Sequence, residues 1–123
     1  MKRNVAFSML AAGLLSACNP LAAQQPKDQI VGRWESPTWT RNEVPLFAQF
    51  SADGRVQYMD SMGTTGRAEW MFLESGDLQL TYPAGLSRRC TVGFDQSKNM
   101  KLTPPTCLYG WDDMGESVVL AKQ

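Results

Sequence analysis

The sequence AEWMFLESGDLQLTY, residues 68–82, decides the fold class of this chain. Apolar residues at positions 68, 70 and 72, and again at 78, 80 and 82, alternate with residues of the opposite face. This period of two is typical of strands with one buried face. The turn residues Glu74-Ser75-Gly76-Asp77 between the two runs form the clearest hairpin signal in the chain. The stretch therefore predicts two adjacent antiparallel strands.

The same pattern recurs on both sides of this hairpin. We expect about eight short strands, separated by turn residues, at 30–35, 46–50, 56–59, 68–73, 78–82, 88–94, 100–103 and 117–121. No stretch after residue 17 sustains the apolar spacing of a helix. Closing such a meander removes its exposed edges, so we expect an all-β, eight-stranded antiparallel barrel over residues 30–123.

The N-terminus has the parts of a secretory signal. Lys2 and Arg3 precede an apolar run over residues 5–15, which would rise only about 16 Å as a helix and is too short to span a membrane. Leu15-Ser16-Ala17-Cys18 resembles the bacterial lipobox. The resemblance implies removal of residues 1–17 and lipid on Cys18, with residues 18–29 as a flexible tether. The alternative is an ordinary secretory signal with an incidental cysteine.

The lipobox also implies a location. Asp after the lipidated cysteine resembles an inner-membrane retention signal, and Asn19 stands there instead. We therefore expect an outer-membrane lipoprotein facing the periplasm. With Cys18 lipidated, Cys90 and Cys107 remain as a pair in an oxidising compartment, which favours a structural disulfide. A redox-active pair is the alternative, but such pairs usually have Cys-x-x-Cys spacing.

The composition excludes several functions. The chain has 12 basic and 12 acidic residues and no histidine. Nucleic acid binding has little electrostatic support, and the commonest general base and metal ligand are missing. The carboxylates of Asp112, Asp113 and Glu116 match no EF-hand spacing and indicate a solvated turn. We expect no enzyme activity, no metal and no cofactor.

Three further features resemble small bacterial lipocalin-like lipoproteins: Gly32-Arg33-Trp34, the turn sequence FSADGR at 50–55, and Lys122 after the last strand. The resemblance implies that Gly32, Trp34 and Lys122 close one end of the barrel, with the lysine over the tryptophan ring. Lipocalins proper usually have arginine at the position of Lys122. The resemblance also implies a non-catalytic carrier of a small apolar molecule.

The predicted inward side chains are large: Trp34, Leu46, Phe50, Val56, Tyr58, Trp70, Phe72, Leu78, Leu80, Tyr82, Val92, Phe94, Met100, Leu102, Val118 and Leu120. An eight-stranded barrel has room for little besides its own side chains. We therefore favour a filled barrel, or one with a shallow mouth, over a deep cavity.

Function would then lie in two irregular segments, 36–43 and 106–116. Trp39 and Arg41 in the first, and Tyr109 and Trp111 in the second, are the candidate ligand- or partner-binding residues, because such side chains are enriched at interfaces. The alternative is that they fold back over the barrel. Two functions remain open: binding of a small apolar ligand at the mouth, and an envelope protein-interaction or inhibitor module.

Overall fold

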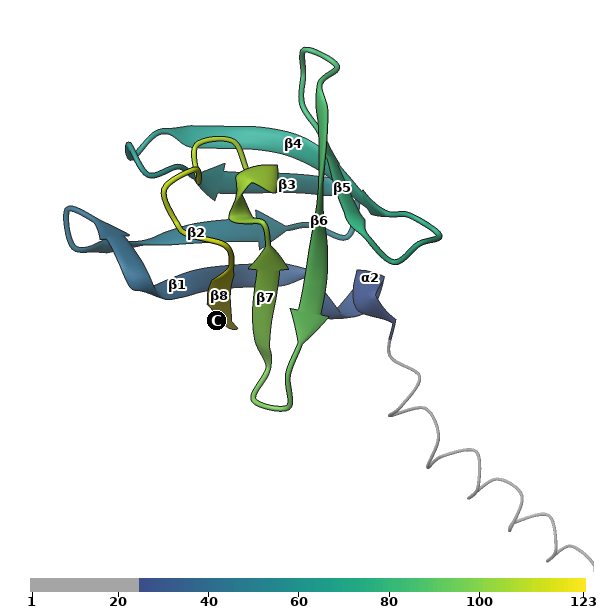
Figure 1. Cartoon of the computed structure of the whole chain (residues 1–123), viewed down its shortest axis with the longest axis horizontal. Helices are drawn as coiled ribbons and strands as arrows, with labels where there is room; N and C mark the ends of the chain where they lie inside the picture. The colour runs from purple at the N-terminus through teal and green to yellow at the C-terminus, as the bar shows by residue number, and fades with distance from the viewer. Residues whose placement is uncertain (1–24) are drawn as a thin grey trace, which may run out of the picture.

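The computed structural model describes residues 25–123, which form a closed antiparallel barrel of eight strands in sequential order (Figure 1). The lipocalin-like, all-β meander expected from the sequence is confirmed. The strands are β1 (Gly32–Arg41), β2 (Val44–Phe50), β3 (Arg55–Met59), β4 (Thr65–Phe72), β5 (Leu78–Thr81), β6 (Ser87–Phe94), β7 (Asn99–Thr103) and β8 (Val118–Lys122).

The up-and-down order assigns alternate connections to opposite ends of the barrel. We call one the loop end; it carries the connections 42–43, 60–64, 82–86 and 104–117. The other, the helix end, carries the turns 51–54, 73–77 and 95–98 together with the short helix α2 (Pro26–Gln29). β1 and β8 close the barrel through the pairs Trp34–Lys122 and Glu35–Ala121.

The helix end is sealed by residues that lie far apart in the sequence. Trp34 is 1% exposed, and its Nε1 donates a hydrogen bond to the carbonyl oxygen of Ile30 at 2.8 Å. The Nζ of Lys122 lies 5.3 Å from the centroid of the Trp34 ring and donates to the carbonyl oxygen of Gln29 at 3.0 Å. Gly32 has φ +138°, and a Cβ there would meet the Lys122 side chain at 2.7 Å.

The structure differs from the expectation in two segments near the start of the barrel, residues 26–29 and residues 36–43. Part of the expected tether, Pro26–Gln29, is helical, which suits a proline in the first turn. The expected loop 36–43 is instead the outer half of β1 and a tight turn. Ser36 Oγ accepts the backbone N–H groups of Thr38 and Trp39 at a register shift, so the strand continues beyond β8. The projecting hairpin 37–44, with its tip at the left of Figure 1, is called the arm.

The residues in the turn of the arm explain why the sequence did not predict a hairpin there. Asn42 and Glu43 have φ angles of 54° and 69°, as two-residue hairpin turns with left-handed residues require. Glycine usually fills the second such position, but Glu43 stands there. Pro37 a few residues earlier also argues against a strand. Pro37 and the turn without glycine are both typical of a loop, so the sequence predicted a loop at 36–43.

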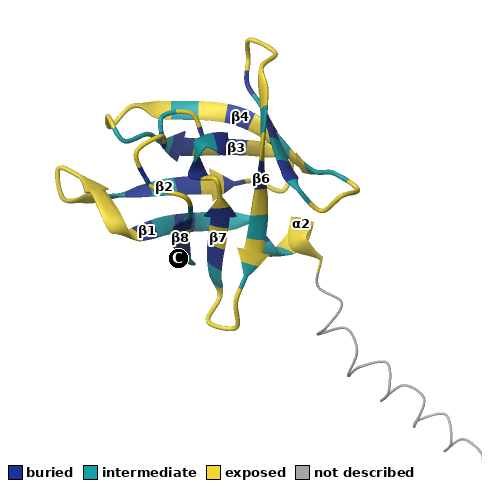
Figure 2. Cartoon of the chain, in the orientation of Figure 1, coloured by how far each residue is buried: buried dark blue, intermediate teal, exposed yellow. Residues whose placement is uncertain are grey.

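The core fills the barrel. Buried residues alternate along the strands, while the exposed residues gather on turns and on the outer face (Figure 2). Twelve of the predicted inward side chains are buried, and Trp70, Phe72, Val92 and Phe94 are half-buried and pack against the core. The core also contains Ala48, Ala68 and Cys90, which lie on the expected inward faces of their strands. The list of inward side chains did not include a further group of core residues, namely Ile30, Cys107, Leu108, Trp111 and Met114.

Candidate functional site at the loop end

The long connection 104–117 covers the loop end from within. A short 3₁₀ helix (Pro105–Cys107) opens it, and Cys107 forms a disulfide with Cys90 on β6, with Cα atoms 5.6 Å apart. The predicted structural disulfide is confirmed. Beyond it, the side chains of Leu108, Trp111 and Met114 are buried in the core. The connection is therefore a lid whose apolar side chains point into the barrel.

Trp111 was expected in a binding surface, and the structure corrects this. Its side chain is 0% exposed, and its Nε1 donates to the carbonyl oxygen of Met59 at 2.8 Å. Its ring meets that of Tyr58 edge to face at a centroid distance of 6.4 Å. The indole has both an apolar environment and a partner for its N–H, which together favour burial over exposure.

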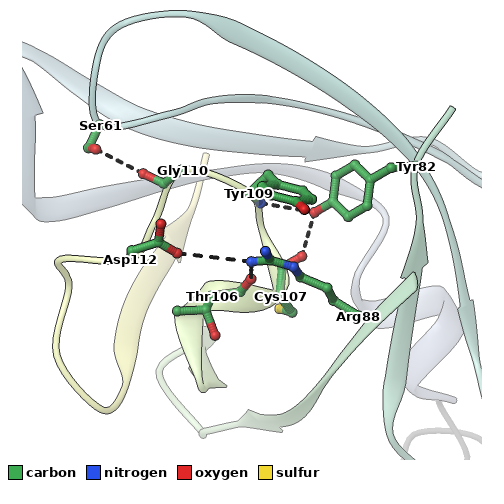
Figure 3. Close-up of polar contacts among 8 residues, drawn as sticks. All are labelled: Ser61, Tyr82, Arg88, Thr106, Cys107, Tyr109, Gly110 and Asp112. Carbon is green, nitrogen blue, oxygen red and sulfur yellow. Dashed lines mark hydrogen bonds and ion pairs between the residues drawn. The ribbon is translucent and has the colours of Figure 1, made fainter. Parts of the chain in front are cut away.

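A buried phenol fastens the lid to β5. The hydroxyl of Tyr82 donates to the carbonyl oxygen of Cys107 and accepts the backbone N–H of Tyr109 at 3.0 Å (Figure 3). Burial raises the pKa of Tyr82, and it raises that of Tyr58 strongly. Both phenols therefore stay protonated at neutral pH and act as fixed hydrogen-bonding groups, which does not suit acid–base chemistry near pH 7.

Arg88 and Tyr109 form the outer layer of the lid. The guanidinium lies 3.6 Å from the centroid of the Tyr109 ring, and its Nη1 donates to the carbonyl oxygen of Thr106 at 2.6 Å (Figure 3). The Asp112 carboxylate lies 3.9 Å from the same nitrogen. Tyr109 remains 38% exposed. The sequence did not identify Arg88 as a site residue. A charged residue on a strand does not indicate that an aromatic ring from a distant loop will pack on its side chain.

The arm and the turn 60–64 complete this end. Trp39 is 37% exposed, and Arg41 is exposed beside Gly63, where an added Cβ would lie 3.3 Å from Arg41 Cγ. Ser61 donates from Oγ to the carbonyl oxygen of Gly110 at 2.8 Å. The arm thus reaches the turn 60–64, and that turn is bonded to the lid.

Exposed apolar side chains concentrate at this end. Seven large apolar residues are exposed within residues 25–123. Only Met71 and Val119 lie on the strands of the barrel wall. The other five surround the loop end, and we call them the rim: Trp39, Val44, Met62, Leu86 and Tyr109. Of these, Val44, Met62 and Leu86 were not predicted, because single apolar residues beside turn residues carry no periodic signal.

The structure separates the predicted site residues into groups. Trp39, Arg41 and Tyr109 lie at the loop end and are accessible, whereas Trp111 lies beneath them. Gly32, Trp34 and Lys122 are together at the helix end. Cys18 lies outside the described residues. A ligand held between Trp39 and Trp111, as the sequence suggested, would have to displace the lid.

An open hollow lies on the outside of the barrel. It has a volume of about 850 Å³ and lies over β3, β4 and β5, where exposed residues such as Arg55, Gln57 and Arg67 alternate with buried ones. Within residues 25–123, no group of three or more metal-ligating side chains forms a candidate metal site. In the same part of the chain, no helix has the length and apolarity needed to cross a membrane.

Comparison with known proteins adds no assignment. No protein-family model matches the chain, and no curated protein is significantly similar to it. The fold and the loop end together define a small, closed and internally filled β-barrel whose most distinctive surface is an apolar rim around a disulfide-bound lid.

Proposed function

We propose that this protein is a lipid-anchored, non-catalytic module of the bacterial envelope that binds another protein through its rim. The observation that carries the proposal is the position of Trp39, Val44, Met62, Leu86 and Tyr109 around one end of the barrel. Exposed apolar side chains scattered singly need no explanation, but a group collected at one end marks an interaction surface.

The composition of the rim favours a protein as the partner. Tryptophan, tyrosine, methionine and arginine are enriched at protein interfaces, and the loop end presents Trp39, Tyr109, Met62 and Arg41. The side chain of Arg41 forms no hydrogen bond or ion pair within residues 25–123. A partner surface with an apolar centre and a neighbouring carboxylate would match this arrangement.

Binding of a small apolar molecule inside the barrel has weaker support. The indole of Trp111 and the phenol of Tyr58 occupy the space below the lid, and both are buried. The hollow over β3–β5 is open and faces outward, and charged side chains such as Arg55, Arg67 and Glu69 line it, which does not suit a wholly apolar ligand. The rim therefore supports the interaction module better than the carrier.

Site-specific photo-crosslinking in the native envelope tests the proposal. A benzophenone amino acid would replace Met62, which is 70% exposed in the turn 60–64, and Tyr109 on the lid. Lys101, exposed on β7, is the control position on the barrel wall. We expect irradiation to give the same discrete protein adduct from positions 62 and 109, and none from 101.

A second variant pair checks that the adduct reports binding. Met62→Asp, placed in the rim, should abolish the adduct formed at position 109, while Met71→Asp on the outer face of β4 should leave it intact. Absence of an adduct from both rim positions, or equal adducts from positions 62 and 101, would overturn the proposal. So would native mass spectrometry that finds one apolar small molecule bound to the whole population.

A further inference from the structure

The hollow over β3–β5, called here the outer groove, lies on a different surface from the rim. Its volume of about 850 Å³ falls in the range of about 300–1,000 Å³ that small-molecule sites occupy. A smaller hollow of about 370 Å³ adjoins it, shares Arg55 and Glu69 with it, and extends to Trp70 and Met71. The two hollows therefore adjoin on the outer face, where polar and apolar surface are mixed.

Strand register places five polar side chains together in this groove. Arg55 pairs with Glu69 across β3 and β4, and Gln57 pairs with Arg67 one step along the same face. Glu69 pairs in turn with Thr81 on β5. Directly paired residues on one face have Cβ atoms about 4.5–5.5 Å apart, so one small ligand can reach all of them.

Most of these groups have no partner in the molecule. Within residues 25–123, the side chains of Gln57, Arg67 and Glu69 form no hydrogen bond or ion pair. The side chain of Arg55 forms one ion pair, in which its Nε lies 3.9 Å from Oδ2 of Asp53, and both side chains are largely exposed. The groove therefore offers neighbouring donors and acceptors whose hydrogen bonds are now made to solvent and are available to a ligand.

The charges of the groove restrict the class of ligand. Arg55 and Arg67 are balanced by Asp53 and Glu69, so neither an anion nor a cation is favoured throughout. An extended peptide would need a free strand edge, but β3, β4 and β5 are each paired on both sides. Recognition must come from side chains, with donors and acceptors mixed.

We propose that the outer groove binds a neutral, hydroxyl-rich oligosaccharide. Each sugar hydroxyl can donate and accept a hydrogen bond, which matches the mixture of Gln57, Arg67 and Glu69. Pro83, which is exposed, contributes apolar surface at one side of the groove, and the half-buried Trp70 lies in the adjoining hollow. These residues can contact the C–H faces of sugar rings. This site does not depend on protein binding by the rim.

Amide chemical shifts measured during sugar titration test the proposal. The probes are chitotetraose and maltotetraose, added separately to the full mature chain in a sugar-free zwitterionic detergent. We expect saturable shifts for at least one probe, confined to β3–β5 and the adjoining 51–54 and 82–86 connections. Arg67→Ala and Glu69→Ala should each weaken binding about tenfold or more. Arg89→Ala, exposed on β6 outside the groove, should not change it.

Several results would overturn this site. They are the absence of a saturable shift with both sugars, shifts centred on the rim, and equal affinity in wild type and Arg67→Ala. If Arg67→Ala lowers the thermal midpoint strongly, Gln57→Ala replaces it, with the same tenfold loss expected. Met62→Asp should leave sugar binding unchanged, so a failure of the rim proposal and a failure of the outer groove can be told apart.

Discussion

At the scale of single residues, the side chain of Trp34 holds the helix end together through three contacts. Its indole donates to Ile30, lies under the ammonium group of Lys122, and contacts Phe94 at a ring-centroid distance of 5.9 Å. Gly32 is needed beside it because Lys122 crosses the backbone there. The short Gly-x-Trp motif and the distant lysine are therefore one structural unit.

We predict that Trp34→Ala lowers the free energy of unfolding by about 3–5 kcal/mol, as truncation of a fully buried large side chain does. The change removes the core volume and leaves the carbonyl of Ile30 without its donor. Urea denaturation followed by circular dichroism measures it. Trp39→Ala, at 37% exposure, is the matched control and should cost much less. Equal midpoints for the two variants would contradict the assignment of Trp34 to the core.

The buried phenols predict a pH dependence of stability. Burial raises the pKa of Tyr58 and Tyr82 above the ordinary value, so the folded protein keeps these protons when the unfolded chain begins to lose them near pH 10. Their contribution is complete below about pH 10 and is lost as the pH rises further. The urea midpoint should therefore stay constant up to about pH 10 and fall as the pH rises above that value.

Tyr58→Phe isolates the phenol from other groups that titrate in this range. The variant should show a shallower fall of the urea midpoint with pH than the wild type. Identical slopes for Tyr58→Phe and wild type would show that the buried phenol does not control the alkaline loss of stability.

At the scale of elements, period-two alternation predicted the strands because each has one face against the core. Most expected boundaries lie within a residue or two of those observed, as for 46–50 against Val44–Phe50 and 100–103 against Asn99–Thr103. The arm escaped prediction because Pro37 and a turn without glycine are typical of a loop. Its strand geometry depends on Ser36, whose hydroxyl accepts two backbone N–H groups in place of a neighbouring strand.

The lid shows a second limit of sequence reasoning. The sequence predicts residues 106–116 to be irregular, and the sequence Tyr109-Gly110-Trp111 suggests a binding surface. Tyr109 is half-exposed and Trp111 is buried because the indole N–H finds the carbonyl of Met59, a residue distant in the sequence. Local composition cannot distinguish these two outcomes. Only the closed barrel brings Met59 and Tyr58 below the lid.

We expect removal of the disulfide to lower the free energy of unfolding and to loosen the lid more than the rest of the barrel. Cys90 and Cys107 are separated by 17 positions, and closure of such a loop stabilises the folded state by about 3 kcal/mol in the chain-entropy model. We expect the double variant Cys90→Ala with Cys107→Ala to lose that amount in urea denaturation. Hydrogen exchange should increase most at the amides of 104–117, beyond the general loss of protection that the lower global stability causes in β3 and β4. Uniform loss of protection would show that the bond supports the barrel rather than the lid.

At the scale of the whole molecule, the rim and the N-terminal side of the chain lie at opposite ends. The described chain begins with α2 at the helix end, where Lys122 donates to Gln29. The residues between Cys18 and α2 can reach at most about 25 Å. With lipid on Cys18, the helix end would lie toward the membrane and the rim away from it. A protein partner would then approach from the aqueous side of the envelope.

Replacement of Cys18 tests this arrangement. If two or three acyl chains on Cys18 provide the anchor, with about 0.8 kcal/mol for each buried CH₂, Cys18→Ser should move the protein from the membrane fraction to the soluble envelope fraction when residues 1–17 are replaced by an ordinary cleavable secretory signal. Mass spectrometry should find lipid on the mature wild-type N-terminus and none on the variant. The Cys90–Cys107 bond should still form, since it lies within the barrel. Asn19→Asp is the matched control, which should keep the lipid but shift the protein toward the inner membrane. A Cys18→Ser protein that stays with the membrane, or a wild-type chain without lipid, would remove the anchor and with it the outward orientation of the rim.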